Sequence, residues 1–205
     1  MTLIELPAGA RLVLASASPR RSELLRSVGL DFDVVPADID ESVQPGETPS
    51  QYVARLSHEK ARVVAARVGG DVIVIAADTT VDVDGQILEK PMDDADARGM
   101  LRLLSGRTHL VHTGVTVSWF PETRARGTTT IVAETAVRFV ELTDRAIDWY
   151  LATGEHAGKA GAYGIQGAAG AFVERVDGSV TNVIGLPLAE TLALLAATVS
   201  STGSR

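Results

Sequence analysis

Four groups of residues in the sequence could bind or cleave a phosphorylated ligand. The first is the run SASPRR at residues 16–21, between a short apolar segment and a helical segment. Backbone N–H groups at a helix start, beside two guanidinium groups, would form a corner that binds phosphate oxygens. The alternative is an ordinary capped helix with two solvated arginines. The candidate substrate ligands in this run are Ser16, Ser18, Arg20 and Arg21.

The second candidate is a lysine on the apolar side of a long predicted helix. The helix is expected to begin at Thr48 or Ser50 and to end near Val68, before two glycines. Its valines and leucine fall on one arc of the helix, and Lys60 falls inside that arc. A lysine facing the core must meet an anion or extend to solvent, and both outcomes stay open.

The third candidate is Asp78, which directly follows the β-branched apolar run at residues 72–77. Such a run indicates a strand covered on both faces. Ligands of α/β sheets gather beyond the carboxyl ends of strands, so Asp78 could hold a metal ion or deprotonate water. The alternative is a turn-forming cap. Lys90, after a predicted hairpin at Asp84-Gly85, is either a phosphate ligand or an exposed lysine.

The fourth candidate is the glycine-rich segment at residues 158–167, which contains Lys159 and Gln166. Glycines let the backbone approach a ligand closely. The Gln166 amide could pair with O4 and N3–H of uracil or thymine, although glutamine also matches adenine. Glycine-rich loops are more often plain turns.

The elements that must position these residues alternate strands with helices. Strands are expected at 11–15, 32–35, 72–77, 109–119 and 128–140, with a short strand pair around Asp177-Gly178. Helices are expected at 20–28, 48–68, 93–104, 143–153 and 187–196. The long strands are expected to be antiparallel. The pattern predicts an α/β fold with a mixed sheet flanked by helices.

Composition excludes several classes of protein. The 205 residues include no cysteine, which rules out disulfides and thiolate metal sites. The net charge of −7 argues against nucleic-acid binding, which normally needs a basic face. No apolar run reaches the roughly 18 to 20 residues that span a bilayer. We therefore expect a cytoplasmic protein that contacts neither nucleic acid nor membrane.

Taken together, the motifs resemble those of the Maf family. The resemblance covers residues 11–196 in family order and rests on these motifs: LASASPRR at 14–21, Glu41, Glu59-Lys60-Ala61, Ala77-Asp78-Thr79, Glu89-Lys90-Pro91, Leu104-Ser105-Gly106 with His109, Thr113-Gly114-Val115, KAGAYGIQG at 159–167 and Gly185-Leu186-Pro187. We expect one domain at residues 1–198, and the small polar residues at the C-terminus predict a disordered tail at 199–205. The implied fold is related to the inosine triphosphate pyrophosphatases, with two lobes and a central cleft.

The activity implied by the resemblance is hydrolysis of a nucleoside triphosphate between the α- and β-phosphates, with Mg²⁺ or Mn²⁺. The loop at residues 163–167 resembles the dTTP/UTP branch, whereas the 7-methyl-GTP branch usually has Glu in place of Gln166. Asp78 matches the proton acceptor, and Arg20, Thr79 and Gln166 match the specificity positions. A homodimer is also implied.

On this resemblance we expect Arg20, Lys60 and Lys90 to hold the triphosphate, with Glu41 or Asp78 as metal ligands. Gly158 departs from the family by replacing an acid that often precedes this Lys-Ala-Gly, and Thr80 replaces a commoner apolar residue. An alternative function is a nucleotide-binding regulator of cell division in which catalysis is incidental.

Overall fold

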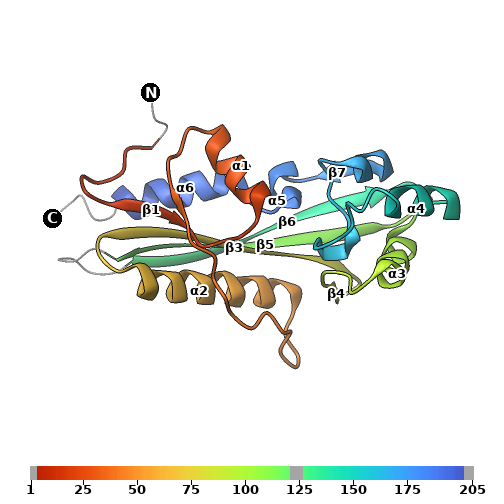
Figure 1. Ribbon diagram of the computed structural model, residues 1–205, viewed down its shortest axis with the longest axis horizontal. Helices are drawn as coiled ribbons and strands as arrows, with labels where there is room; N and C mark the ends of the chain where they lie inside the picture. The colour runs from red at the N-terminus through yellow and green to blue at the C-terminus, as the bar shows by residue number, and fades with distance from the viewer. Residues whose placement is uncertain (1–3, 121–126, 201–205) are drawn as a thin grey trace.

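The protein folds around one seven-stranded mixed sheet flanked by helices, as seen in a computed structural model (Figure 1). The structure describes residues 4–120 and 127–200. The strands are β1 (Arg11–Leu14), β2 (Asp33–Val34), β3 (Val72–Val83), β4 (Gln86–Leu88), β5 (Thr108–Phe120), β6 (Gly127–Phe139) and β7 (Val173–Asp177). Their order is β2-β1-β3-β5-β6-β7, and β4 pairs with β3. Strand β1 is parallel to β2 and β3, while the remaining pairs are antiparallel.

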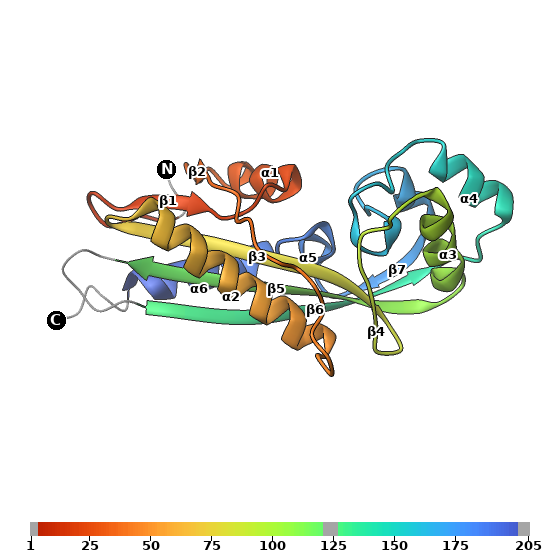
Figure 2. The same cartoon turned by 60° about the horizontal axis from the view of Figure 1, so that its bottom comes forward.

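Strand pairing is interrupted on the edge of β3 that faces away from β5. Strand β1 pairs with the first part of β3, as far as the pair Leu14–Ile75. Strand β4 pairs with the last part, from Val81 onward. Neither strand pairs with residues 76–80 of β3, so this stretch has an open edge in the middle of a long strand. The long strands β3, β5 and β6 run through both halves of the molecule, the half that contains β1 and α1 and the half that contains α3 and α4 (Figure 2).

Helices cover both faces of the sheet. They are α1 (Pro19–Ser27), α2 (Pro49–Val68), α3 (Asp94–Leu104), α4 (Asp144–Leu151), α5 (Val180–Ile184) and α6 (Leu188–Ser200), with 3-10 turns η1 (Ala160–Ala162) and η2 (Ala168–Phe172). Helix α2 lies on one face, and α1 and α6 lie on the other (Figure 1). A capping box between Thr48 and Gln51 fixes where α2 begins.

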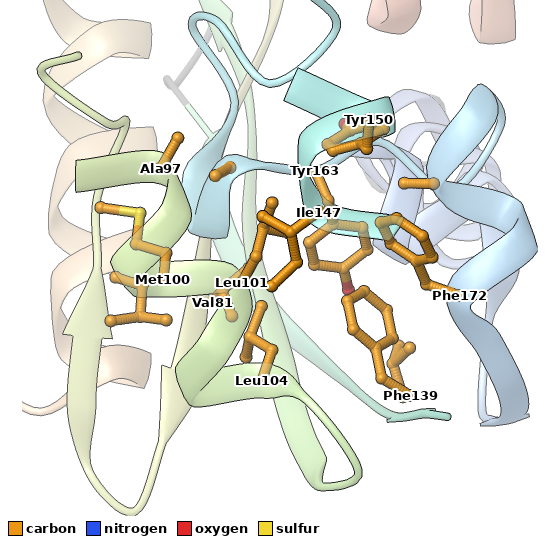
Figure 3. Close-up of a cluster of buried hydrophobic side chains, with 14 of the residues drawn as sticks. Val81, Ala97, Met100, Leu101, Leu104, Phe139, Ile147, Tyr150, Tyr163 and Phe172 are labelled. Atoms are coloured by element: carbon orange, nitrogen blue, oxygen red, sulfur yellow. The ribbon is translucent and has the colours of Figure 1, made fainter. Parts of the chain in front are cut away.

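The half of the molecule that contains β4, α3, α4 and β7 has its own apolar core beneath α3 and α4, which we call the second core. Phe139 is fully buried and makes edge-to-face contacts with Tyr163 and Phe172, with ring centroids 4.9 and 6.0 Å apart (Figure 3). Leu101 and Ile147 supply the helical side of this core. Edge-to-face pairs fix ring orientation as well as burying apolar area. The core therefore gives Tyr163, which lies within the glycine-rich segment at residues 158–167, a defined position.

Most of the predicted elements are present within one or two residues, and the α/β fold with a mixed sheet is confirmed. The hairpin is also confirmed, because Asp84 and Gly85 both have positive φ. The strand pair around Asp177-Gly178 was wrong: β7 ends at Asp177, and helix α5 follows. Helix α6 continues to Ser200, so the predicted tail at 199–205 begins within a helix, and residues 201–205 lie outside the described residues.

Candidate active site

A cavity of about 500 Å³ opens beside the interrupted edge of β3. This volume lies within the range of small-molecule sites. All of the candidate residues from the sequence line it: Ser16, Ser18, Arg20, Arg21, Glu41, Lys60, Asp78, Thr79, Lys90, Lys159 and Gln166. The structure thus brings together residues from the turn after β1, from α1, the loop before α2, α2, β3, the segment after β4, and the glycine-rich loop. Their individual roles stay predictions.

Lys60 lies at the centre of a chain of charged groups. Its Nζ is 2.6 Å from Asp78 Oδ1 and 2.5 Å from Glu41 Oε1, and the lysine is only 6% exposed. The other oxygen of Glu41 accepts a hydrogen bond from Lys90 Nζ at 3.0 Å. Burial acts to raise the pKa of Glu41, but the two lysines outweigh it and lower that pKa to about 2. Of the two alternatives for Lys60, the structure shows the buried lysine that meets anions.

Asp78 lies in the middle of β3, where it pairs with Gly114 of β5. Both sequence interpretations of this residue were therefore wrong about its backbone, because the strand neither ends before it nor turns at it. The parallel part of the sheet does end here, since β1 stops opposite Ile75. Asp78 thus lies beyond the carboxyl end of β1, while its own strand continues as the partner of β5. Among the described residues, Asp78 Oδ2 has no hydrogen-bond partner.

The two arginines of the first motif differ sharply. Arg21 is fixed by three hydrogen bonds: Nε donates to the Gly185 carbonyl at 2.8 Å, and the two terminal nitrogens donate to Ser16 Oγ and Thr79 Oγ1, both at 3.0 Å. This fork ties α1, the turn after β1, β3 and the segment after α5 together. In the part of the chain described, no hydrogen bond or ion pair holds Arg20. Arg20 thus has its guanidinium donors free for a ligand.

The turn before α1 is built as its sequence suggests, with one difference. Ser18 is the N-cap and Pro19 the first helical residue, but the Ser18 side chain makes no capping hydrogen bond. Instead the Ser18 N–H donates to Ser16 Oγ at 3.2 Å. The Ser18 hydroxyl therefore lines the cavity without a capping role.

The glycine-rich loop forms the opposite wall. Tyr163 anchors it from within the second core, where its hydroxyl lies 2.8 Å from His109 Nε2. Burial lowers the pKa of His109 to about 4 and raises the pKa of Tyr163, so both groups are neutral near pH 7. Gln166 is exposed at the cavity. Burial, and then the charge of Arg20, lower the pKa of Lys159, whose ammonium group donates to the Glu155 carbonyl.

Several residues that hold the site residues in place were not predicted from the sequence. Tyr52 donates its hydroxyl to the Glu41 carbonyl at 2.9 Å and thereby fixes the loop before α2. Thr113 lies 2.9 Å from Thr79 through their hydroxyls and donates to the carbonyl of Asn182, which is fully buried. Thr113 belongs to the Thr113-Gly114-Val115 motif, but nothing in the sequence around Tyr52 or Asn182 distinguishes them from ordinary core residues.

The donor set fits a hard divalent cation only in part. Among residues 4–120 and 127–200, no three His, Cys, Asp or Glu side chains gather closely enough to hold a metal ion. Glu41 and Asp78 nevertheless come from separate segments and converge on one point at Lys60 Nζ. Two carboxylates suit Mg²⁺, which is usually held by one or two carboxylates with substrate phosphates and waters.

Comparison with known proteins decides the family. A family model described as Maf-like protein matches residues 11–198. The chain belongs to the Maf family. A Maf relative from Anaeromyxobacter dehalogenans (strain 2CP-C), named dTTP/UTP pyrophosphatase, is 56% identical over 90% of this chain and 92% of its own. Relatives of the same name from Caulobacter vibrioides and Hahella chejuensis are 53% and 50% identical, over 92% of this chain and 95% and 92% of theirs.

Solved structures resemble this Maf chain more distantly. A HAM1 protein from Coxiella burnetii is 18% identical, with a TM-score of 0.45 over 94% of this chain and 100% of its own. That likeness is too low to bear on the site. No helix among the described residues combines the length and apolar character that crossing a bilayer requires.

Proposed function

We propose that this Maf protein hydrolyses dTTP and UTP to the monophosphate and pyrophosphate. The observation that carries the proposal is the convergence of Glu41 and Asp78 on Lys60 Nζ, in a cavity that also holds Gln166. Relatives at 50 to 56% identity named dTTP/UTP pyrophosphatase support this choice of substrate. A triphosphate carries about four negative charges, and an acidic protein needs a local cluster of cations to bind it.

Asp78 is suited to accept the proton of the attacking water. One of its oxygens is held by Lys60, and the other is free of protein partners among the described residues. As the water oxygen bonds to phosphorus, its proton passes to Asp78, and the phosphoanhydride bond between the α- and β-phosphates breaks. The pyrophosphate leaves with the bonding electron pair, and Arg20, Lys60 and Lys90 offset its charge.

We further propose that Glu41 and Asp78 hold a divalent ion, Mg²⁺ or Mn²⁺. When bound, such an ion would neutralise charge on the phosphate oxygens. The protein itself contributes the two carboxylates and the cations that bind and orient the substrate. The Gln166 amide would pair with O4 and N3–H of the base.

The first experiment is a substrate panel of dTTP, UTP, CTP, GTP, 7-methyl-GTP and ITP with Mg²⁺ or Mn²⁺, scored for pyrophosphate and phosphate. We expect pyrophosphate from dTTP and UTP, and a loss of about a hundredfold or more in kcat for Asp78→Asn. Undiminished turnover in that variant would exclude Asp78 as the proton acceptor. Nucleotide binding without any turnover would instead favour the regulator.

Two lysine variants separate the buried cation from the exposed one. Lys60→Met removes the charge shared by Glu41 and Asp78, so we expect turnover to fall by at least about tenfold and the melting temperature to fall as well. Lys90 has a side chain 62% exposed, so Lys90→Met is expected to raise KM with little change in melting temperature. Wild-type kinetics in Lys60→Met would contradict its assigned role.

We also propose that the protein acts in the cytoplasm as a homodimer on free nucleotides rather than on nucleic acid. The net charge of −7 supports the last point. Light scattering at several protein concentrations tests the dimer, and a monomer throughout would contradict it.

A further inference from the structure

Glu155 touches both ends of the glycine-rich loop from outside the cavity. It lies in the turn after α4. Its Oε2 accepts a hydrogen bond from the Ala168 N–H at 2.9 Å, directly after the segment that carries Gln166. Its backbone carbonyl accepts a hydrogen bond from Lys159 Nζ. One residue thus contacts both sides of the loop that presents two candidate substrate ligands.

Gly167 packs directly against the Glu155 carboxylate. A Cβ atom placed on Gly167 would lie 1.9 Å from Oε2 and 2.8 Å from Cδ of Glu155. The backbone of Gly167 has φ −105° and ψ −153°, an extended conformation that any residue adopts. A side chain at this position would therefore displace the neighbouring carboxylate, although the backbone angles would accept it.

Ile165 and Ala168, on either side of Gln166, pack against the second core, and hydrogen bonds fix the tip of the loop further. Within it, the Gly167 N–H donates to the Gly164 carbonyl at 3.1 Å, closing a tight turn around Gln166. The turn is anchored on one side by Tyr163 in the second core. On the other side, the Glu155 carboxylate fixes the Ala168 N–H, and a charged acceptor makes such a hydrogen bond stronger than a neutral one.

We infer that Glu155 is a positioning residue whose carboxylate holds the Gln166 turn in place, and thereby sets selectivity among pyrimidine bases. This inference rests on the proposed function. The Gln166 amide has a donor end and an acceptor end, and it matches uracil or thymine only in a fixed orientation. In a loosened turn the amide can rotate, which presents the donor where the acceptor stood and matches cytosine as well.

The test begins with two substitutions at Glu155. For Glu155→Ala we expect KM for dTTP and UTP to rise about tenfold with a smaller change in kcat, and the ratio of kcat/KM for dTTP over CTP to fall by a similar factor. Glu155→Gln keeps a carbonyl oxygen that accepts the Ala168 N–H, so it should retain most of the selectivity. A purely structural role predicts instead equal losses on all nucleotides, in step with the melting temperature.

A double-substitution cycle with Gly167 makes the test specific. The methyl group in Gly167→Ala must displace the Glu155 carboxylate, so this variant should show the same rise in KM as Glu155→Ala. The variant carrying both changes should be no worse than either alone, because the two substitutions break one contact. Gly99→Ala, at a glycine with no neighbour within 4 Å of its added methyl group, is the matched control.

The inference is overturned if the two effects multiply, if Gly167→Ala keeps the wild-type KM, or if Glu155→Ala keeps the wild-type selectivity. Dissociation constants of dTTP and CTP, measured by calorimetry without added metal, give a second reading of the same cycle. If the wild-type protein releases no pyrophosphate but binds dTTP selectively through Glu155, the proposed function fails and the inference stands. If turnover is normal and the cycle is multiplicative, the inference alone fails.

Discussion

Gly114 lies directly opposite Asp78 in the ladder between β3 and β5, and the backbone of α2 passes over it. A Cβ atom on Gly114 would lie 2.2 Å from the Val53 carbonyl oxygen and 2.9 Å from the Ala54 nitrogen. Backbone atoms of a long helix cannot yield locally. Glycine at this position therefore sets how closely α2, and with it Lys60, approaches Asp78.

We predict that Gly114→Ala displaces α2 and lengthens the contact between Lys60 and Asp78. Overpacking of this kind costs about 1–3 kcal/mol in the free energy of unfolding, and turnover should fall by at least about tenfold. Denaturant unfolding and steady-state kinetics measure the two effects. The control is Gly99→Ala in α3, which meets no neighbour and should stabilise the protein by up to about 1 kcal/mol. Full activity in Gly114→Ala would contradict this account of α2.

Substitutions of Arg21 and Arg20 should affect different properties. The first should lower the free energy of unfolding, and the second should weaken substrate binding. Arg21→Lys keeps the charge but cannot reach Gly185, Ser16 and Thr79 together, so we expect a loss of about 2 kcal/mol in unfolding free energy. Arg20→Lys should leave the melting temperature unchanged and raise KM for the triphosphate. The opposite assignment of effects would show that Arg20 is the structural residue of the pair.

The hydroxyl group of Thr80 is a buried polar group that should lower stability. The residue is 1% exposed, and its hydroxyl oxygen has no hydrogen-bond partner among the described residues. Thr80→Val replaces the hydroxyl by a methyl group of similar size, so we expect stabilisation by about 1 kcal/mol, or about 2–4 °C in melting temperature. Calorimetric unfolding measures this. A lower melting temperature would mean that the hydroxyl has a partner in solution, such as an ordered water.

Stability should depend on pH through His109. Its pKa in the folded protein is lowered to about 4 from 6.5 because the ring is buried. Between these values the unfolded chain binds a proton that the folded protein does not, so stability is lost as pH falls from about 6.5 to about 4. The contribution is at most about 3 kcal/mol. Unfolding measured across this range should lose that dependence in His109→Gln, which keeps a polar group facing Tyr163.

Glu41 affects the free energy of unfolding in a lower pH range than His109, so the two contributions can be measured separately. Its pKa is about 2 in the folded protein, against an ordinary value of 4.5 for a glutamate in the unfolded chain. Its stabilisation is therefore present above pH 4.5 and is lost as pH falls toward 2. A wild-type slope between pH 6.5 and 4.5 that persists in His109→Gln would exclude His109 as its source.

How far the sequence predicts the site depends on whether a signal is local. Lys60 was found because the apolar arc of a helix is a local pattern, and the structure places it between two carboxylates. The course of β3 was not predictable in the same way. Its polar residues 78–80 suggested that the strand ended, whereas the interruption belongs to the neighbouring strands. Periodicity within one segment carries no information about where its neighbours stop.

Helix α5 shows the limit of intrinsic preference. Val180, Thr181, Val183 and Ile184 are β-branched and favour a strand. The segment is helical because Ser179 caps it, and because the Asn182 amide donates to the Val111 carbonyl at 2.9 Å and to Thr135 Oγ1 at 3.0 Å. These partners lie far along the chain, so tertiary contacts override the local preference. The same reason hides Glu155, whose importance depends on its contact with Gly167.

The open edge of β3 between β1 and β4 has a mechanical consequence. Among the described residues, the three long strands β3, β5 and β6 are the strands that run from one half to the other, and each half has its own core. The relative position of the two halves therefore depends on the course of these three strands. A nucleotide whose phosphates bind Arg20 and whose base binds Gln166, as proposed, would connect the two halves across this open edge. Asp78 lies within the open stretch, at the point where the two halves meet.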